Sequence, residues 1–182
     1  MLQLKIPLSA EGWDEEKQEF VEPVTAVLEL EHSLVSLSSW ESKWRKPFLS
    51  KEAKTAEETL DYIKCMTLTP NVDPVVYTKL TNENIQAVND YIGAPMTATT
   101  FNEREGGGKG GREIVTAELI YYWMIALQIP PEYRFWHLNQ LLTLVRVCNI
   151  KNTPPKKMSK RDAMSRNAKL NAARRKQMNT TG

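Results

Sequence analysis

Cysteine and histidine are scarce in this chain of 182 residues, which contains only two of each. Cys65 and Cys148 are isolated among apolar neighbours, and His32 and His137 are scattered along the chain. Structural zinc sites use Cys and His ligands at short, characteristic spacings, which are lacking here. The sequence therefore argues against a metal site, and the isolated thiols are typical of a protein in a reducing compartment.

Long apolar runs are also lacking. A membrane-spanning helix needs about 20 predominantly apolar residues, and no stretch of this chain approaches that length. The first residues, MLQLKIPLSAEGWDEE, do not have the basic segment followed by an apolar stretch that marks a signal peptide. We therefore expect neither a membrane partner nor a signal peptide.

The charges are divided unevenly along the chain, although the net charge is only +2. Residues 151–182 carry ten basic residues and one acidic residue, a net charge of +9, whereas residues 1–150 carry 14 basic and 21 acidic residues, a net charge of −7. We interpret this as an acidic folded body, 1–150, followed by a basic C-terminal tail, 151–182. A tail of this sign attracts phosphate, an anionic surface or an acidic protein.

The basic tail also has two alternative roles. It could be a solvated extension that favours solubility, or it could fold back on its own acidic body or on that of a second copy, so self-association is an alternative. The residues that we take as candidates for partner binding in the tail are Lys156, Lys157, Lys160, Arg161, Arg166, Arg174 and Arg175.

Alternating apolar residues predict two strands near the N-terminus. Residues 2–8 place Leu2, Leu4, Ile6 and Leu8 on one face, and residues 24–31 alternate in the same way less strictly. Alternation with one polar face is typical of antiparallel strands. We therefore expect a two-stranded ribbon within residues 1–31 that packs against helices.

Helical patterns follow from residue 33 to residue 149. A stripe with helical spacing ends before Pro47 and consists of Leu34, Leu37, Trp40 and Trp44. Thr55 and Glu58 form a capping-box pattern for a second helix. A further helix is expected to start at Thr81 and to end at Gly93 in the left-handed conformation.

The strongest core signal lies in residues 113–129, EIVTAELIYYWMIALQI, which are apolar nearly all round. Such a helix is expected at the centre of a fold. Pro130 and Pro131 end it, and a second helix running to about Asn149 completes a short-looped αα-hairpin. The predicted fold class is thus α+β and mainly helical: an N-terminal ribbon, a helical body around this hairpin and a basic helical tail.

No catalytic arrangement is recognisable in the sequence. The segment GGGKGG, residues 106–111, is not a phosphate-binding P-loop, because Lys109 is followed by glycine and no strand pattern precedes it. His137 lies between Trp136 and Leu138, which is typical of a hydrogen-bonded structural histidine. We therefore expect a protein that is not an enzyme and has no cofactor.

Several longer strings resemble one family of small proteins from siphophages and prophages. They are LELEHSLVSLSSWESKWRKPFLS (28–50), MTLTPNVDP (66–74), APMTATTF (94–101), ELIYYWMIALQIP (118–130) and HLNQLLTLVRVCNIKNTPPKKMSKRD (137–162). Together they cover most of the chain. Members of this family resemble products of the tail module, where tail assembly chaperones occur.

The resemblance implies a chaperone in the host cytoplasm that binds phage tail proteins, the tape measure protein or the tail tube. That role requires an apolar and aromatic binding surface, for which Trp40 and Trp44 are the candidates. The alternative is a structural virion protein, a head–tail connector or tail component, whose basic tail contacts neighbouring subunits or DNA. Nucleic acid is a less favoured partner, because residues 156–175 have no interleaved aromatic residues on which bases could stack.

Overall fold

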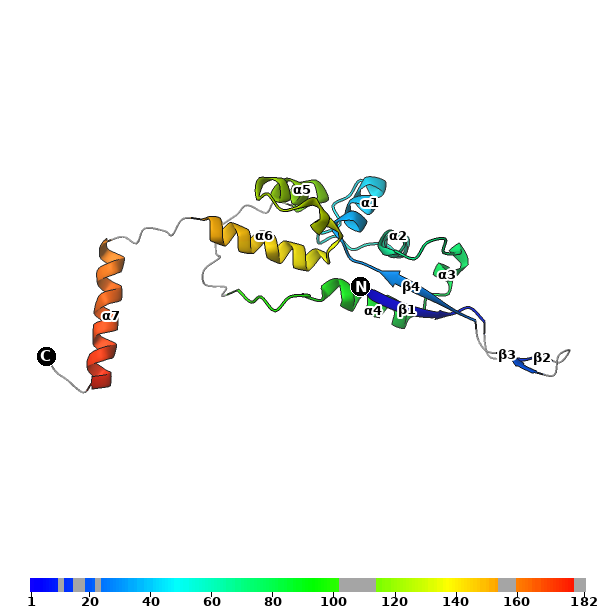
Figure 1. Cartoon of the computed structure of the whole chain (residues 1–182), viewed down its shortest axis with the longest axis horizontal. Helices are drawn as coiled ribbons and strands as arrows, with labels where there is room; N and C mark the ends of the chain where they lie inside the picture. Colours follow the sequence, from blue (N-terminus) through cyan, green and yellow to red (C-terminus); the bar gives the residue numbers. More distant parts are fainter. Residues whose placement is uncertain (10–11, 15–18, 22–23, 102–113, 154–159, 179–182) are drawn as a thin grey trace. The chain divides into compact units, whose positions relative to one another are not determined.

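The computed structural model describes the chain except for residues 10–11, 15–18, 22–23, 102–113, 154–159 and 179–182. The structure is α+β and mainly helical, as the sequence predicted, with an antiparallel ribbon near the N-terminus (Figure 1). The chain divides into two compact units, Met1–Asn149 and Ile150–Gly182, so that the division falls in the last turn of helix α6, Leu138–Asn152. The glycine-rich segment 106–111 lies outside the described residues.

The predicted ribbon consists of strands β1, Leu2–Pro7, and β4, Thr25–Leu30. They pair antiparallel with Leu4 opposite Leu28. One face of the ribbon is buried, and its apolar residues are Leu4, Ile6, Leu28 and Leu30. This burial explains the alternation in the sequence, since successive side chains of a strand point to opposite faces.

A second, shorter antiparallel pair lies between these strands in the sequence. It joins β2, Gly12–Asp14, to β3, Glu19–Val21. The sequence pattern did not predict it.

The second edge of β4 is bonded to the chain that follows helix α2. Glu31 N donates to Met66 O at 2.9 Å, Leu68 N donates to Glu29 O at 2.7 Å, and Glu29 N donates to the Thr69 hydroxyl at 2.8 Å. A bonded strand edge is not available for pairing with another chain. These bonds also connect the ribbon to the helical part of the unit.

Helices α1, Leu34–Trp44, and α2, Ala56–Met66, begin where the sequence predicted. Ser33 is the N-cap of α1, and its hydroxyl accepts from Ser36 N at 3.2 Å. Thr55 and Glu58 form the predicted capping box of α2, with Glu58 Oε2 accepting from Thr55 N at 2.8 Å. Satisfying the free N–H groups of the first turn in this way stabilises each helix by about 1 kcal/mol.

The segment between α2 and α5 contains two further helices. Helix α3, Pro74–Thr78, was not predicted; its N-cap is Asp73, whose carboxylate accepts from Val75 N at 2.9 Å. Helix α4, Asn82–Gly93, begins after Thr81 as predicted. It also ends at Gly93 as predicted, but the predicted left-handed conformation is wrong, because no described glycine has a positive φ and Ala94 leaves the helix in an extended conformation.

The central hairpin differs from the prediction in four respects. Helix α5, Ala117–Ala126, is shorter than the apolar segment, and a 3-10 helix, η2 at Pro131–Phe135, separates it from α6. Helix α5 packs mainly against α1 and not against α6. It is also not buried all round, since it buries only Ala117, Ile120 and Met124.

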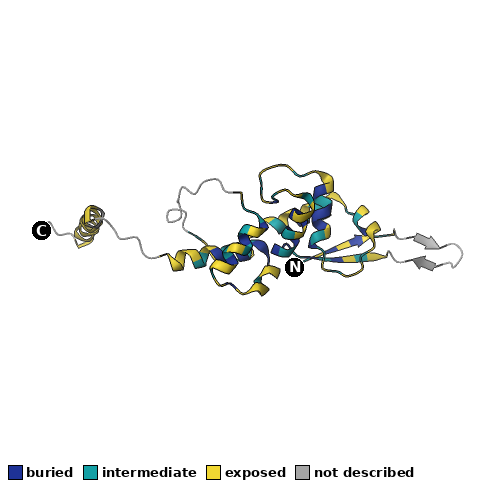
Figure 2. Cartoon of the chain, turned by 90° about the horizontal axis from the view of Figure 1, so that it is seen from above, coloured by how far each residue is buried: buried dark blue, intermediate teal, exposed yellow. Residues whose placement is uncertain are grey.

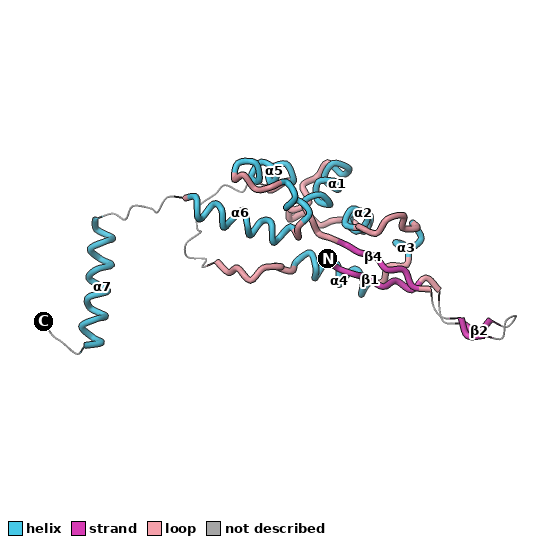
Figure 3. The backbone as a smooth tube through the Cα atoms, in the orientation of Figure 1, coloured by secondary structure: helices cyan, strands magenta, loops and turns pink. Residues whose placement is uncertain are grey.

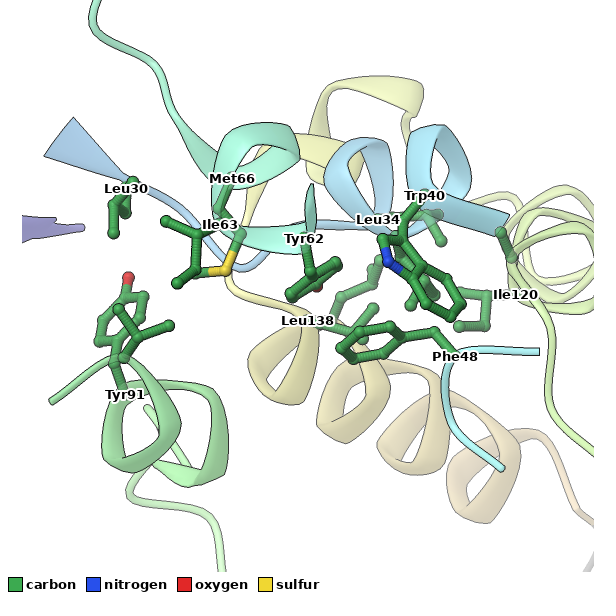
Figure 4. Close-up of a cluster of buried hydrophobic side chains, with 14 of the residues drawn as sticks. Leu30, Leu34, Trp40, Phe48, Tyr62, Ile63, Met66, Tyr91, Ile120 and Leu138 are labelled. Carbon is green, nitrogen blue, oxygen red and sulfur yellow. The ribbon is translucent and has the colours of Figure 1, made fainter. Parts of the chain in front are cut away.

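An aromatic cluster forms the centre of the core (Figure 4). The rings of Phe48 and Tyr62 stack with centroids 3.9 Å apart, and Trp40 meets Phe48 edge-on at 5.1 Å. Trp40 Nε1 donates to Glu58 O at 2.9 Å, which satisfies its only polar atom. Leu138 of α6 and Ile120 of α5 complete this cluster, so it connects α1, α2, α5 and α6.

A buried carboxylate connects three of these segments. Glu41 of α1 is 8% exposed. Its Oε1 accepts from Phe48 N and its Oε2 accepts from Ala117 N, both at 2.7 Å. One side chain thus binds the chain that follows α1 and the first turn of α5, where the partial positive charge of the helix N-terminus favours an anion.

The second unit contains helix α7, Lys160–Met178, so the basic tail is helical as predicted. Every side chain of α7 that the structure describes is exposed (Figure 2). Basic residues lie on all sides of α7, at about 100° per residue, so the helix is not amphipathic.

We predict that Glu41→Gln destabilises the protein by about 2 kcal/mol, because the amide presents an N–H to one of two buried backbone donors and leaves it unsatisfied. Chemical denaturation monitored by circular dichroism measures the loss. Glu132→Gln, at an exposed position of η2, is the matched control and should change stability by less than about 0.5 kcal/mol. Equal effects of both changes would contradict the connecting role of Glu41.

The two faces of α5 supply a second prediction. Ile120→Ala should lower the free energy of unfolding by about 2–4 kcal/mol because it removes fully buried methyl groups. Ile125→Ala removes the same atoms from a side chain that is 77% exposed and should change it by less than about 0.5 kcal/mol. Denaturation midpoints of the two variants check this difference, and comparable losses would show that the outer face of α5 is also buried.

Candidate partner-binding surfaces

An open groove of about 690 Å³ lies in the first unit beside helix α5. Its walls come from the loop after α1, from the chain just before α5, and from α5 and α6, whose course Figure 3 shows. The residues that line it are Leu49, Ser50, Lys51, Glu52, Ile114, Val115, Trp123 and Leu142. Most of this lining is apolar, so the groove suits an apolar segment of a partner.

Apolar side chains are exposed both in the groove lining and elsewhere on α5. Ile114 is 57% exposed, and on α5 Tyr122 and Ile125 are 62% and 77% exposed. Contiguous exposed apolar residues mark interaction surfaces more often than isolated ones do. The apolar residues of α5 therefore lie on two faces: one face packs on α1, and the other apolar side chains are exposed.

A second groove, of about 420 Å³, lies on the other side of Leu142. It runs between α6 and the extended segment 94–101 that follows α4 (Figure 3). The Arg146 guanidinium lies 3.9 Å from the centroid of the Phe101 ring, and Asn139 Nδ2 donates to Ala94 O at 2.8 Å. These contacts attach the segment to α6, so this groove is more polar than the first.

The two predicted tryptophans do not lie in either groove. Trp40 is 1% exposed and belongs to the core, which corrects its assignment as a partner contact: a side chain so deeply packed offers no surface. Trp44 is half-buried against Trp40, with ring centroids 6.1 Å apart, and its Nε1 donates to Asp61 Oδ2 at 3.0 Å. The hydrogen bond from its indole nitrogen thus connects α1 to α2.

Charged groups strengthen the same contact. Lys43 Nζ forms an ion pair with Asp61, and Lys46 Nζ lies 2.6 Å from Glu58 Oε1. Burial opposes ionisation of Asp61, but the hydrogen bonds from Lys43 and Trp44 outweigh it and hold the pKa of the carboxyl below its usual value. The hydrogen bond from Lys46 likewise lowers the pKa of Glu58, so both carboxylates are ionised at neutral pH. Lys43 of α1 and Lys46, just after α1, thus have structural roles.

The basic candidates of the tail are only partly described. Lys156 and Lys157 lie outside the described residues. The others are exposed on α7: Lys160, Arg161, Arg166, Arg174 and Arg175. None of the ion pairs found among the described residues involves them.

The two histidines form a buried pair, with ring centroids 5.1 Å apart. His32 Nδ1 lies 2.5 Å from the Tyr62 hydroxyl. His137 Nε2 lies 3.0 Å from Tyr91 O, while Asn139 N donates to His137 Nδ1 at 3.3 Å. His137 is therefore neutral with its proton on Nε2, as a hydrogen-bonded structural histidine.

Burial governs the protonation of this pair. It lowers the pKa of His32 to about 3, and the neighbouring His137 adds to the shift. Burial likewise lowers the pKa of His137. Both side chains are over nine-tenths buried, and neither lines the two grooves described above. Leu138 N donates to His32 O at 2.7 Å, so this region holds the start of α6 against the chain that follows β4.

The described residues give no support for a metal site or for a membrane-spanning helix. No group of three or more His, Cys, Asp or Glu in that part of the chain is placed to hold a metal ion. No described helix is long and apolar enough to cross a membrane. Cys65 and Cys148 are free thiols and half-buried, less so than the sequence suggested, and burial raises the pKa of Cys65.

Comparisons with protein-family models, with curated proteins and with solved structures find no match to this chain. The grooves and the basic helix are therefore interpreted from their own geometry and chemistry.

Because both histidines are buried, we predict that the stability of the protein depends on pH. The unfolded chain binds a proton at His32 near pH 6.5, whereas the folded chain binds it only near pH 3. The contribution of neutral His32 to the free energy of unfolding is thus complete above pH 6.5. As the pH is lowered from 6.5 toward 3, the free energy of unfolding falls by at most about 1.4 kcal/mol per pH unit.

Denaturation between pH 6.5 and pH 5 isolates this effect from the carboxylates, which titrate at lower pH. His32→Gln removes the titrating group, so the variant should show a flatter pH dependence than the unaltered protein, whatever its stability at pH 7. Parallel curves for the two proteins would show that His32 is not buried in its neutral form.

Proposed function

We propose that the protein is a non-enzymatic factor of phage tail morphogenesis, a tail assembly chaperone that binds the tape measure protein in the host cytoplasm. The observation that carries this proposal is the open apolar groove between the loop 49–52, α5 and α6. The family resemblance of five segments of the sequence supplies the biological setting.

The groove suits the chemistry of such a partner. Recognition of an amphipathic helix requires an apolar trough that accepts side chains at positions i, i+3, i+4 and i+7. Trp123 and Leu142 supply half-buried apolar surface in the trough, and Ile114 supplies exposed surface at its margin. A long helical tape measure chain exposes apolar surface before the tail tube covers it, and a chaperone would cover part of that surface.

A structural virion protein is the second candidate, and the exposed basic helix α7 favours it. The described side chains of this helix are all exposed, so it can contact neighbouring subunits or DNA within a particle. The two candidates differ in where the protein is found after assembly.

Mass spectrometry of purified virions separates them. A chaperone is absent from the particle and co-purifies with the tape measure protein from lysates before assembly. Stoichiometric presence of the chain in the virion would reject the chaperone and support the structural role.

A matched pair of variants tests the groove itself. Ile114→Glu places a charge at the margin of the groove and should lower recovery of soluble, co-expressed tape measure protein at least tenfold, because the charge would have to be desolvated on binding. Val75→Glu is the control, since Val75 is 54% exposed but does not line the groove. Equal recovery with both variants would show that the partner binds elsewhere.

A further inference from the structure

We propose that helix α7 binds double-stranded DNA by lying in the major groove and contacting phosphates on both sides, without reading base sequence. This proposal is independent of the role in tail assembly. It rests on the length of α7, the distribution of its charges and the small number of its apolar residues.

Helix α7 is long, exposed and charged on all sides. Its 19 residues correspond to a length of about 28 Å at 1.5 Å per residue. Within Lys160–Met178 the only acidic residue is Asp162, and the basic residues are Lys160, Arg161, Arg166, Lys169, Arg174, Arg175 and Lys176. At about 100° per residue these basic residues are spread around the whole helix and do not form one stripe.

The scarcity of apolar residues argues against a protein as the principal partner. In its 19 residues α7 has three large apolar side chains, Met164, Leu170 and Met178, which lie six and eight positions apart and are 74%, 46% and 76% exposed. A helix that docks in the groove of a protein presents closely spaced anchors, at positions i, i+3, i+4 and i+7. The same scarcity argues against a membrane surface, which requires a continuous apolar face.

The charge pattern suits a groove with phosphates on both walls. The major groove of B-form DNA is about 12 Å wide and admits an α-helix, so basic residues on opposite sides of α7 meet phosphates of both strands. Double-stranded RNA has a narrower major groove that excludes a helix. Single strands are usually bound by stacking on aromatic residues, and residues 160–178 contain none.

Binding of this kind also relieves repulsion within the helix. Arg166 and Lys169 are three positions apart, so their side chains are neighbours on the helix surface. Like charges at this spacing destabilise an isolated helix. Phosphates neutralise these charges, so the helix and its complex with DNA stabilise each other.

The test is fluorescence anisotropy of the full-length protein with a labelled 24-base-pair DNA of mixed sequence, at salt concentrations from 50 to 200 mM. If all seven basic residues contact phosphates, the logarithm of the association constant falls with the logarithm of the salt concentration with a slope of about −6. The triple variant R166Q/K169Q/R174Q should make this slope less steep by about 3 and weaken binding on the order of 100-fold at 100 mM salt.

Two further variants make the result specific to α7. K5Q/K64Q/K79Q removes three exposed lysines from the first unit and should bind as the unaltered protein does. R166K/R174K keeps the charges of α7 and should retain binding, since phosphate attraction does not require the guanidinium group. Far-ultraviolet circular dichroism checks that the helical content of each variant is retained.

Several outcomes would overturn the proposal. Absence of binding at 50 mM salt, or an equal loss with both triple variants, would show that α7 is not the binding surface. Equally tight binding of double-stranded RNA or of polyglutamate would show attraction to any polyanion and reject the major-groove geometry. Tighter binding of single-stranded DNA would likewise reject it.

Discussion

The carboxylate of Glu41 holds two segments that are far apart in the sequence against helix α1. It accepts hydrogen bonds from Phe48 N and from Ala117 N, both at 2.7 Å. Leu49 and Ser50 follow the first of these residues, and Ile114 and Val115 precede the second, and all four line the apolar groove. One buried charge therefore positions two walls of the surface that we propose as the partner-binding site.

Burying a carboxylate is costly unless hydrogen bonds replace its lost hydration. Here two backbone donors do so, and one belongs to the first turn of α5, where the helix dipole favours an anion. The same side chain contributes to the stability of the fold and to the shape of the groove. Helix α5 can then leave part of its apolar surface exposed, because the Ala117, Ile120 and Met124 stripe on α1 and the bond to Glu41 suffice to hold it.

The two units offer two different kinds of binding. The groove of the first unit is apolar and shaped by tertiary contacts, which suits a helical protein segment. Helix α7 of the second unit is charged on all sides and has few apolar residues, which suits a polyanion. A factor that acts where tail proteins and packaged DNA come together would use both binding surfaces. Separate measurements test the two proposals.

Much of the local structure followed from the sequence. Alternation in residues 2–8 and 24–31 predicted the ribbon, capping motifs at Ser33 and Thr55 predicted the starts of α1 and α2, and the charge split predicted a basic helical tail. Each of these patterns spans only a few residues, because strand pleating, helix periodicity and capping depend on near neighbours along the chain. The end of α4 shows the limit of such signals, since Gly93 did not adopt the left-handed conformation that its residue type favours.

What the sequence by itself determined was thus where the longer strands and helices lie and where the charge lies, while the short elements β2, β3, α3 and η2 were not foreseen. Which face of each helix is covered was decided only by the tertiary structure. The all-apolar segment 113–129 and the stripe with Trp40 and Trp44 each suited core and surface alike, and the structure buried Trp40 while it left Ile125 exposed. The physical reason is that burial depends on partners distant in sequence, as in the bond between Glu41 and Ala117, and no local pattern of residues encodes such a pairing.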